Sequence, residues 1–148
     1  TQVICESSDE GVLYAMGNEN SGLTVFVQNQ RLVVDYNAFN DHSILESDHS
    51  IVEGDNELSV LITRTGRRSG NIEISVNGEV CGSIELPFMM RMISSIGASV
   101  GLDRGSAVSE RYESPYPFTG EIKDLTIQLG TRTAGEDEAS AAAEMSRQ

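Results

Sequence analysis

Hydrophobic and polar residues alternate with a period of two along most of this chain. Such alternation is typical of β-strands that bury one face, because successive side chains point to opposite sides of a strand. No helical period is found before residue 135. Short strands separated by Gly, Asn and Asp turns favour an all-β sandwich or barrel. The alternating apolar positions are Val12, Tyr14 and Met16; Leu23, Val25 and Val27; Leu32, Val34 and Tyr36; Leu58, Val60 and Ile62; Ile72, Ile74 and Val76; and Val80, Ile84 and Leu86.

Two local signals refine this pattern. Asn77-Gly78 separates two alternating runs, and it predicts a hairpin with a type I′ turn because both residues tolerate positive φ. A final strand is predicted from Gly120 to Leu129. Its alternation changes phase between Ile122 and Leu125, which predicts a β-bulge near Asp124.

Length and composition indicate one folded domain followed by a tail. The chain has 148 residues and is 39% hydrophobic with no Trp, so its core is expected to consist mainly of Ile, Val, Leu and Met. We expect the domain to span residues 1–129 and the acidic, Ala/Glu-rich residues 130–148 to form a flexible tail or a frayed helix. The chain begins at Thr1 inside a predicted strand, without a leader segment, which favours a piece of a longer polypeptide.

The charge of the chain excludes some partners. A formal net charge of −13 and a pI near 4.4 disfavour binding to nucleic acid and to anionic lipid. The acidic residues are distributed along the chain, as in a solvated, solubilising surface. No run of 18 apolar residues predicts a membrane span. A cytoplasmic and a periplasmic location in a bacterium both remain open, as does the oligomeric state.

Four groups of segments, taken in order, carry a resemblance to a known family. They are Gly11–Gly17 with Gly22–Val27 and Arg31–Asn37; Ile72–Gly78; Val100–Gly105; and Pro115–Ile122. Together they resemble the C-terminal concanavalin A-like, or laminin-G-like, domain of bacterial arylsulfatases in the alkaline-phosphatase-like superfamily. The resemblance covers about residues 3–129. It implies a jelly-roll sandwich of two antiparallel sheets, appended to a catalytic domain of the same polypeptide.

The same resemblance implies a function for the chain. It implies a non-catalytic accessory domain that packs against the catalytic domain, whose parent protein is a sulfuric ester hydrolase. The parent would need a divalent cation, calcium, and a formylglycine made in a Cys/Ser-x-Pro/Ala-x-Arg sequence. Cys5 precedes Glu-Ser-Ser-Asp and Cys81 precedes Gly-Ser-Ile-Glu, so neither has this context. We therefore predict no catalytic, cofactor-binding or metal-binding residue in this chain, and leave open whether the two cysteines pair.

Several polar residues have both a functional and a structural interpretation. His42 and His49 each lie in Asp-His-Ser, where they could form a metal or acid–base site or simply two polar turns. Seven residues of extended strand would separate them by about 20 Å, which favours the turns. Asp103 is a candidate calcium ligand, but a turn-stabilising residue or an ion pair with Arg104 is favoured because no dense Asp/Asn loop surrounds it.

Two segments are candidate interfaces. Arg64, Arg67 and Arg68 surround Gly66, and their guanidinium groups suit an anion or a docking partner, or else protect a strand end by their charge. The second segment follows Pro87 and is rich in Met, which adapts to irregular partners, so it is predicted either as an exposed contact surface or as core. Its candidate residues are Phe88, Met89, Met90 and Met92.

The alternative function is a free-standing, lectin-like carbohydrate-binding module. Sugar rings stack on aromatic side chains, and the chain has four Tyr and no Trp. Tyr14 and Tyr36 lie in phase with the predicted core, which leaves Tyr112 and Tyr116 as the candidate glycan contacts.

Overall fold

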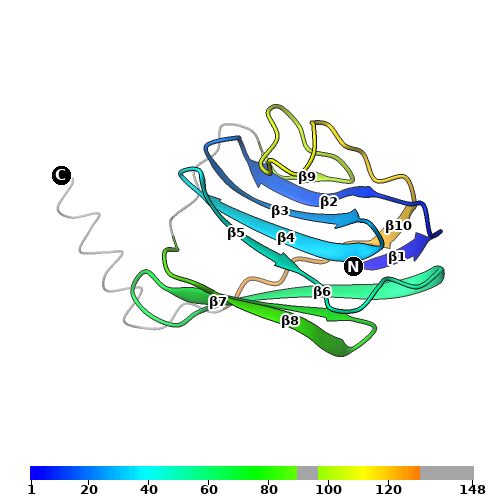
Figure 1. Ribbon diagram of the computed structural model, residues 1–148, viewed down its shortest axis with the longest axis horizontal. Helices are drawn as coiled ribbons and strands as arrows, with labels where there is room; N and C mark the ends of the chain where they lie inside the picture. The colour runs from blue at the N-terminus through cyan, green and yellow to red at the C-terminus, as the bar shows by residue number, and fades with distance from the viewer. Residues whose placement is uncertain (90–96, 131–148) are drawn as a thin grey trace.

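A computed structural model describes residues 1–89 and 97–130 of the chain, and these residues form strands and turns without a helix. Two antiparallel five-stranded sheets stack face to face (Figure 1), which confirms the predicted all-β sandwich. One sheet has the order β10-β1-β6-β7-β8, and the other has the order β5-β4-β3-β2-β9. The strands are β1 Gln2–Cys5, β2 Gly11–Gly17, β3 Ser21–Gln28, β4 Arg31–Ala38, β5 Asp41–Glu46, β6 Gly54–Arg64, β7 Gly70–Val76, β8 Glu79–Leu86, β9 Ser99–Val100 and β10 Glu121–Asp124. The expectation of a flexible tail falls on residues 131–148, outside the described residues.

The main core lies between the two sheets and is built from the inward side chains of both. The alternating positions predicted for β3, β4, β6 and β7 all belong to this core or pack against it. Phe118 and Ile122, near β10, pack against the same core from the edge. Because each strand contributes every second residue, the period-two pattern of the sequence corresponds directly to this inner layer.

Three hairpins close through two-residue turns in which both residues have positive φ. In the β7–β8 turn, Asn77 and Gly78 have φ values of 52° and 81°, which confirms the predicted hairpin. The β3–β4 turn is formed by Asn29-Gln30 and the β4–β5 turn by Phe39-Asn40, with positive φ throughout. The second and third turns were not predicted, since neither contains glycine.

Bulges in two strands change which side chains face the core from what the alternation predicts. Pairing shifts between Val12 and Tyr14 in β2, so Leu13 enters the main core while Val12 faces the outer side of the sheet. In β8, a second shift opposite Ile74 and Ser75 leaves Cys81 as the extra residue, so Val80 lies on the opposite face from Ile84 and Leu86. Val80 is paired with Ser75 and is 58% exposed, and the prediction that it shares their face was wrong. A single added residue reverses every following side chain, because the period of a strand is two.

The last strand is shorter than predicted. β10 ends at Asp124, which is paired with Gln2, and a register shift opposite Gln2 and Val3 places a bulge at the predicted point. No strand partner lies beside residues 125–130 in the described part of the chain. Ile127 and Leu129 are therefore 57% and 91% exposed instead of lining a strand face.

Candidate functional site

A loop formed by residues 101–118 lies across the outer face of the β5-β4-β3-β2-β9 sheet, and we call it the clamped loop (Figure 1). It buries a second, smaller hydrophobic cluster, separate from the main core. Its approach to the sheet is close: a Cβ on Gly11 would lie 2.2 Å from the backbone oxygen of Pro117. Both faces of this sheet are thus covered, one by the other sheet and one by the loop. The buried residues of the outer cluster are Val12, Ala15, Phe26, Val33 and Tyr112.

Asp103 is the centre of the contacts that hold the clamped loop together. It is only 1% exposed, and its Oδ2 accepts hydrogen bonds from the Val108 backbone N–H at 3.0 Å and from the Tyr112 hydroxyl at 2.6 Å. The Tyr112 hydroxyl also lies 3.0 Å from Thr24 Oγ1 on β3. Since a phenol has one proton, Thr24 donates in this second bond. One buried carboxylate therefore orders the loop and, through Tyr112, attaches it to the sheet.

Asp35 is the second buried carboxylate, and it lies on β4 facing the loop. It is fully buried, and both of its carboxylate oxygens lie 2.9 Å from Nδ1 of His42, which donates to them. Ser109 of the clamped loop also hydrogen-bonds to this carboxylate. The next outward residue of β4, Asn37, donates to the backbone oxygen of Val108 at 3.1 Å. We call the set of Thr24, Asp35, Asn37, His42, Asp103, Ser109 and Tyr112 the outer-face network.

The antiparallel register of β4 and β5 explains why Asp35 and His42 meet. Asp35 is paired with Ile44, and His42 lies two residues from Ile44 on the same strand. Residues two apart on a strand share a face, so His42 is the diagonal neighbour of Asp35. The two-residue Phe39-Asn40 turn fixes this register, because a longer turn would shift the pairing.

Burial changes the acidity of several groups around this network. Desolvation raises the pKa of Asp35, and the hydrogen bonds from Ser109 and His42 oppose that rise, while the charge of Glu110 adds to it. Burial also raises the pKa of Tyr112 well above its ordinary value, and the bond to Asp103 acts in the same direction. Tyr116 has its pKa raised to about 12, first by burial and then by its bond to Glu10.

The chemistry open to the outer-face network is limited by its own bonds. A serine–histidine–carboxylate relay needs the hydroxyl on the imidazole, whereas Ser109 bonds to the carboxylate of Asp35. The Nε2 atom of His42 is buried without a hydrogen bond, and its nearest charged group is Glu110 Oε1 at 4.0 Å. No group of three or more metal-ligating side chains occurs within residues 1–89 and 97–130. The carboxylates of Asp35 and Asp103 and the Tyr112 hydroxyl are engaged in holding the loop, whereas His42 Nε2 is buried without a hydrogen bond.

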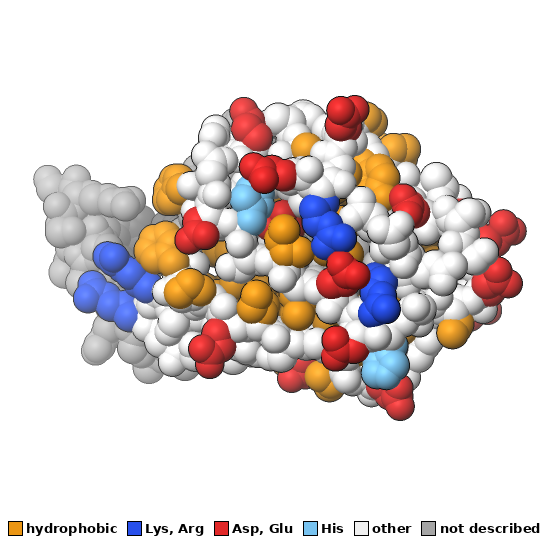
Figure 2. All heavy atoms as spheres, in the orientation of Figure 1, with side chains coloured by type: hydrophobic (Ala, Val, Ile, Leu, Met, Phe, Trp, Pro, Cys, Tyr) orange, Lys and Arg blue, Asp and Glu red, His pale blue; other side chains and the backbone are white. Residues whose placement is uncertain are grey.

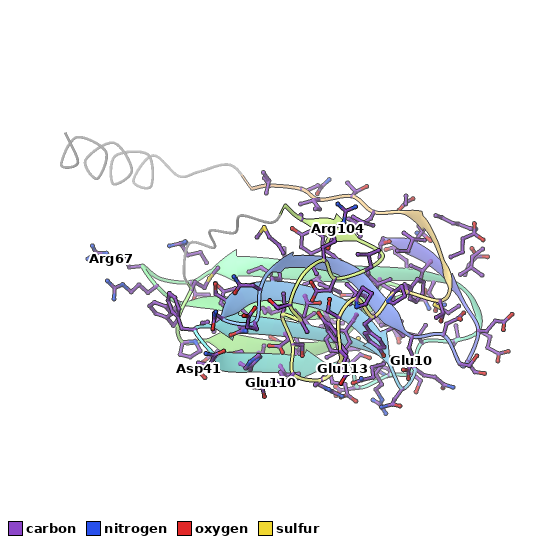
Figure 3. The ribbon with its side chains drawn as sticks, turned by 90° about the horizontal axis from the view of Figure 1, so that it is seen from above. Glu10, Asp41, Arg67, Arg104, Glu110 and Glu113 are labelled. Atoms are coloured by element: carbon purple, nitrogen blue, oxygen red, sulfur yellow. The ribbon has the colours of Figure 1, made fainter. Side chains whose placement is uncertain are left out.

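Polar contacts at the border of the clamped loop complete its attachment. The Tyr116 hydroxyl donates to Glu10 Oε2 at 2.8 Å, and Arg111 contacts Gln28 Oε1 at 3.1 Å and Glu46 Oε2 at 3.0 Å. Figure 3 places Glu10, Glu110 and Glu113 along one side of the molecule, beside this loop. The border is therefore acidic, and Arg111 offsets part of that charge.

The two tyrosines proposed as glycan contacts differ in how much of their surface is exposed. Tyr112 is 8% exposed, and its ring packs against Phe26 at 5.1 Å and against Tyr116 at 5.0 Å between centroids. Tyr116 is half-buried and covers the stack. In this packing the ring of Tyr112 is part of the outer cluster, and Tyr116 alone of the two presents surface to a ligand.

Most of the predicted interface residues come together at one end of the sandwich. The β4–β5 turn and the β6–β7 turn lie at this end in Figure 1, and β8 ends there. Its hydrophobic side chains lie beside its arginines in Figure 2, and Figure 3 shows Arg67 extending from it. Met90 and Met92 lie outside the described residues. We call the set of Phe39, Arg64, Arg67, Arg68, Phe88 and Met89 the basic–apolar end.

The cysteines are structural in this fold. Both thiols are free and buried, and burial, with a smaller contribution from Asp9, raises the pKa of Cys5 to about 11. Two strands separate β1 from β8 in their sheet, so Cys5 and Cys81 are at least about 14 Å apart, too far for a disulfide. His49 is exposed in a turn, with no contact to His42 among the described residues.

Sequence reasoning missed three features of these regions. It considered His42 only with His49, although Asp35 stands out as a charged residue within the apolar run Leu32–Tyr36. For Asp103 it favoured a turn-stabilising residue or an ion pair with Arg104, and it missed the bond to Tyr112. It also missed Phe39, whose place in a turn between two alternating runs was the available signal.

Comparisons with models of protein families, with curated proteins and with solved structures give no match for this chain. Within the described residues, no helix is long and apolar enough to cross a membrane.

Proposed function

We propose that the chain is a non-catalytic accessory domain of an arylsulfatase, packed against the catalytic domain of the same polypeptide. The observation that supports the non-catalytic part of this proposal is the burial and hydrogen bonding of the outer-face network. Asp35, Asp103 and Tyr112 are buried and hydrogen-bonded inside the domain. A catalytic carboxylate or imidazole needs an accessible atom at which a proton or substrate is exchanged, and these groups offer none.

The arylsulfatase part of the proposal depends on the sequence resemblance to the C-terminal domains of that family, and the fold is compatible with that resemblance. The segments that carry the resemblance form β2, β3, β4, the β7 hairpin and the two ends of the clamped loop. These are parts that build a sandwich, as expected for an accessory domain. Neither cysteine has the neighbours needed for formylglycine, and both are buried, so that group and its cation belong to the catalytic domain in this proposal.

The test uses the complete gene product beside the isolated chain. The gene is expected to encode Cys/Ser-x-Pro/Ala-x-Arg outside this chain, and its product is expected to hydrolyse 4-nitrophenyl sulfate in the presence of calcium. The isolated chain, folded by circular dichroism, is expected to give no turnover. Turnover by the isolated chain would overturn the non-catalytic assignment, and a gene without the motif would overturn the arylsulfatase assignment.

A glycan array separates this proposal from the lectin-like alternative. The accessory-domain proposal expects no saturable binding by the folded, isolated chain. Saturable binding that is lost in Tyr116→Ala and retained in Tyr14→Ala would instead identify a carbohydrate-binding module. Tyr14 is a suitable control because its half-buried ring lies on β2, outside the stack formed by Tyr112 and Tyr116.

A further inference from the structure

Phe39 occupies a backbone position that rarely holds a large side chain. Its φ is 55°, in the left-handed region, where the Cβ of an L-residue crowds the backbone and Asn or Gly is preferred. The other two turns of this kind have Asn at the same position, Asn29 and Asn77. Only the β4–β5 turn among these three places an aromatic residue there, and its side chain is 68% exposed.

The exposed ring and the strained backbone of Phe39 do not stabilise the described domain. A ring that stays in water contributes little to stability, while its left-handed backbone costs free energy. Strain of this kind clusters at sites where function requires it. The combination therefore points to a ligand that buries the ring.

The arginines of the β6–β7 turn, which lies at the same end of the sandwich as the turn that holds Phe39, supply a second, independent observation. In the described residues the remaining basic side chains are mostly matched: Arg31 and Arg111 pair with Glu46, and Lys123 pairs with Asp55. Arg67 and Arg68 are exposed and form no ion pair with any described carboxylate. In a chain of net charge −13, two neighbouring cations without internal partners are suited to an external acidic group.

Phe88 and Met89 extend the apolar part of this end. Phe88 is 38% exposed, and Met89 is half-buried with its backbone N–H bonded to the oxygen of Arg68. The Met89 sulfur lies so close to Gly70 that a Cβ there would be 2.0 Å away, which fixes this segment against the base of the β6–β7 turn. Aromatic residues, Met and Arg are the types enriched in the centres of protein interfaces.

We propose that the basic–apolar end is a docking surface for an acidic protein surface with an apolar centre, and that Phe39 is its anchor. The partner carboxylates pair with Arg67 and Arg68, and its apolar centre receives Phe39 and Phe88. Identifying that partner as the catalytic domain rests on the proposed function. The docking surface itself rests on the exposed ring, its strained turn and the two arginines.

The first experiment compares hydrogen exchange in the complete gene product and in the isolated chain. Slower exchange is expected in residues 36–42, 63–70 and 86–89 of the complete product, with no change in the Asn77-Gly78 turn at the end of the β7–β8 hairpin. Protection confined to another face overturns the proposed surface, even when sulfatase activity is present. A product without sulfatase activity that still shows this protection leaves the surface supported and removes only the catalytic identity of the partner.

The second experiment needs no knowledge of the gene and uses the isolated chain with random copolymers. A Glu–Tyr copolymer, which is acidic and aromatic, is expected to bind in a salt-dependent manner and more tightly than polyglutamate. Arg67→Glu with Arg68→Glu is expected to weaken binding at least tenfold, and Phe39→Asn at least threefold. Arg104→Glu is the matched control, because Arg104 is an exposed arginine on the clamped loop.

Each outcome of the second experiment decides the proposal. The double variant reverses two charges and the Arg104 control reverses one, so a control that loses half or more of the double variant's binding free energy would attribute binding to net charge and overturn the proposal. Binding of heparin that exceeds that of the copolymer and is unaffected by Phe39→Asn would assign the arginines to a polyanion, which also overturns it. Circular dichroism and thermal unfolding confirm that each variant is folded, with Phe39→Asn expected to unfold at an equal or higher temperature.

Discussion

Two regions of this sandwich treat charge in opposite ways. At the clamped loop, the carboxylates of Asp35 and Asp103 are 0% and 1% exposed. Asp35 accepts hydrogen bonds from His42 of β5 and Ser109 of the loop, and Asp103 accepts them from two residues of its own loop. At the basic–apolar end, Arg67 and Arg68 are in solvent without an ion pair among the described residues. A charge that is buried on folding needs hydrogen bonds or an opposite charge within the fold. An exposed charge is solvated and stays available to a binding partner.

This comparison distinguishes polar groups that hold the fold together from polar groups that are available to a partner, in a chain whose acidic residues are spread along its length. Buried polar groups attract attention as candidate catalytic residues, because active sites also bury and perturb them. Here three bonds join the loop to the sheet: Tyr112 to Thr24, Ser109 to Asp35, and Asn37 to the backbone oxygen of Val108. The surface without internal partners is the better candidate for function, and the following changes test that distinction.

The largest effect is expected from Asp103→Ala. The variant leaves the Tyr112 hydroxyl and the Val108 N–H without their acceptor in a buried site. Each unsatisfied buried group costs about 1–3 kcal/mol, so a loss of about 2–5 kcal/mol in the free energy of unfolding is expected. Urea denaturation measures it. Asp103→Asn, which retains one acceptor oxygen, is expected to lose less; a loss below about 0.5 kcal/mol in the alanine variant, the range of ordinary surface changes, would contradict the role assigned to the network.

Tyr112→Phe is expected to have a smaller effect at the same place. It keeps the ring in the outer cluster and removes only the hydroxyl that links Asp103 to Thr24. The expected loss is about 1–3 kcal/mol, measured by the same denaturation. Tyr14→Phe serves as the control, because the Tyr14 hydroxyl has only a 3.8 Å contact with the Met16 sulfur. Equal losses in the two variants would show that the bond to Asp103 has no special weight.

Alkaline pH is expected to weaken the border of the clamped loop through Tyr116. Burial and the bond to Glu10 raise its pKa from 10.0 to about 12 in the folded chain. A pKa raised by folding contributes stability that is complete below pH 10 and is lost as pH rises through 12. Phenolate absorbance is expected to show a step near pH 12 that Tyr116→Phe removes. Complete ionisation of all four tyrosines near pH 10 in the folded protein would contradict this environment.

The main core and the principal hairpin were predictable because they depend on local chemistry. Alternation places Leu32, Val34 and Tyr36 on one face whatever their partners are, and Asn77-Gly78 specifies its own turn. The facing of Val80 relative to Ile84 and Leu86 could not be predicted, because the bulge at Cys81 that separates them is set by pairing with β7. Register is a relation between strands, and a single strand does not contain it.

The outer-face network was hidden from the sequence for a related reason. Asp103 and Thr24 are 79 positions apart in the chain and meet only because the clamped loop folds back over the sheet. Asp35 and His42 were closer to being found, since a two-residue turn makes them diagonal neighbours. The arginines of the basic–apolar end were predicted as a possible interface from their contrast with an acidic chain. That interface prediction is still untested.

The smallest effect is expected at the basic–apolar end, and with the opposite sign. Phe39→Asn places a residue that tolerates left-handed backbone at a φ of 55°, and removes an exposed ring from water. A gain of about 0.5–1 kcal/mol in the free energy of unfolding is expected, within the cost of an L-residue in this region. Asn29→Phe, the reverse change in the β3–β4 turn, is expected to lose a similar amount. If Phe39→Asn instead destabilised the isolated chain, the ring would belong to the fold and the comparison between the two regions would fail, because Phe39 would then be held by the domain as Asp103 is.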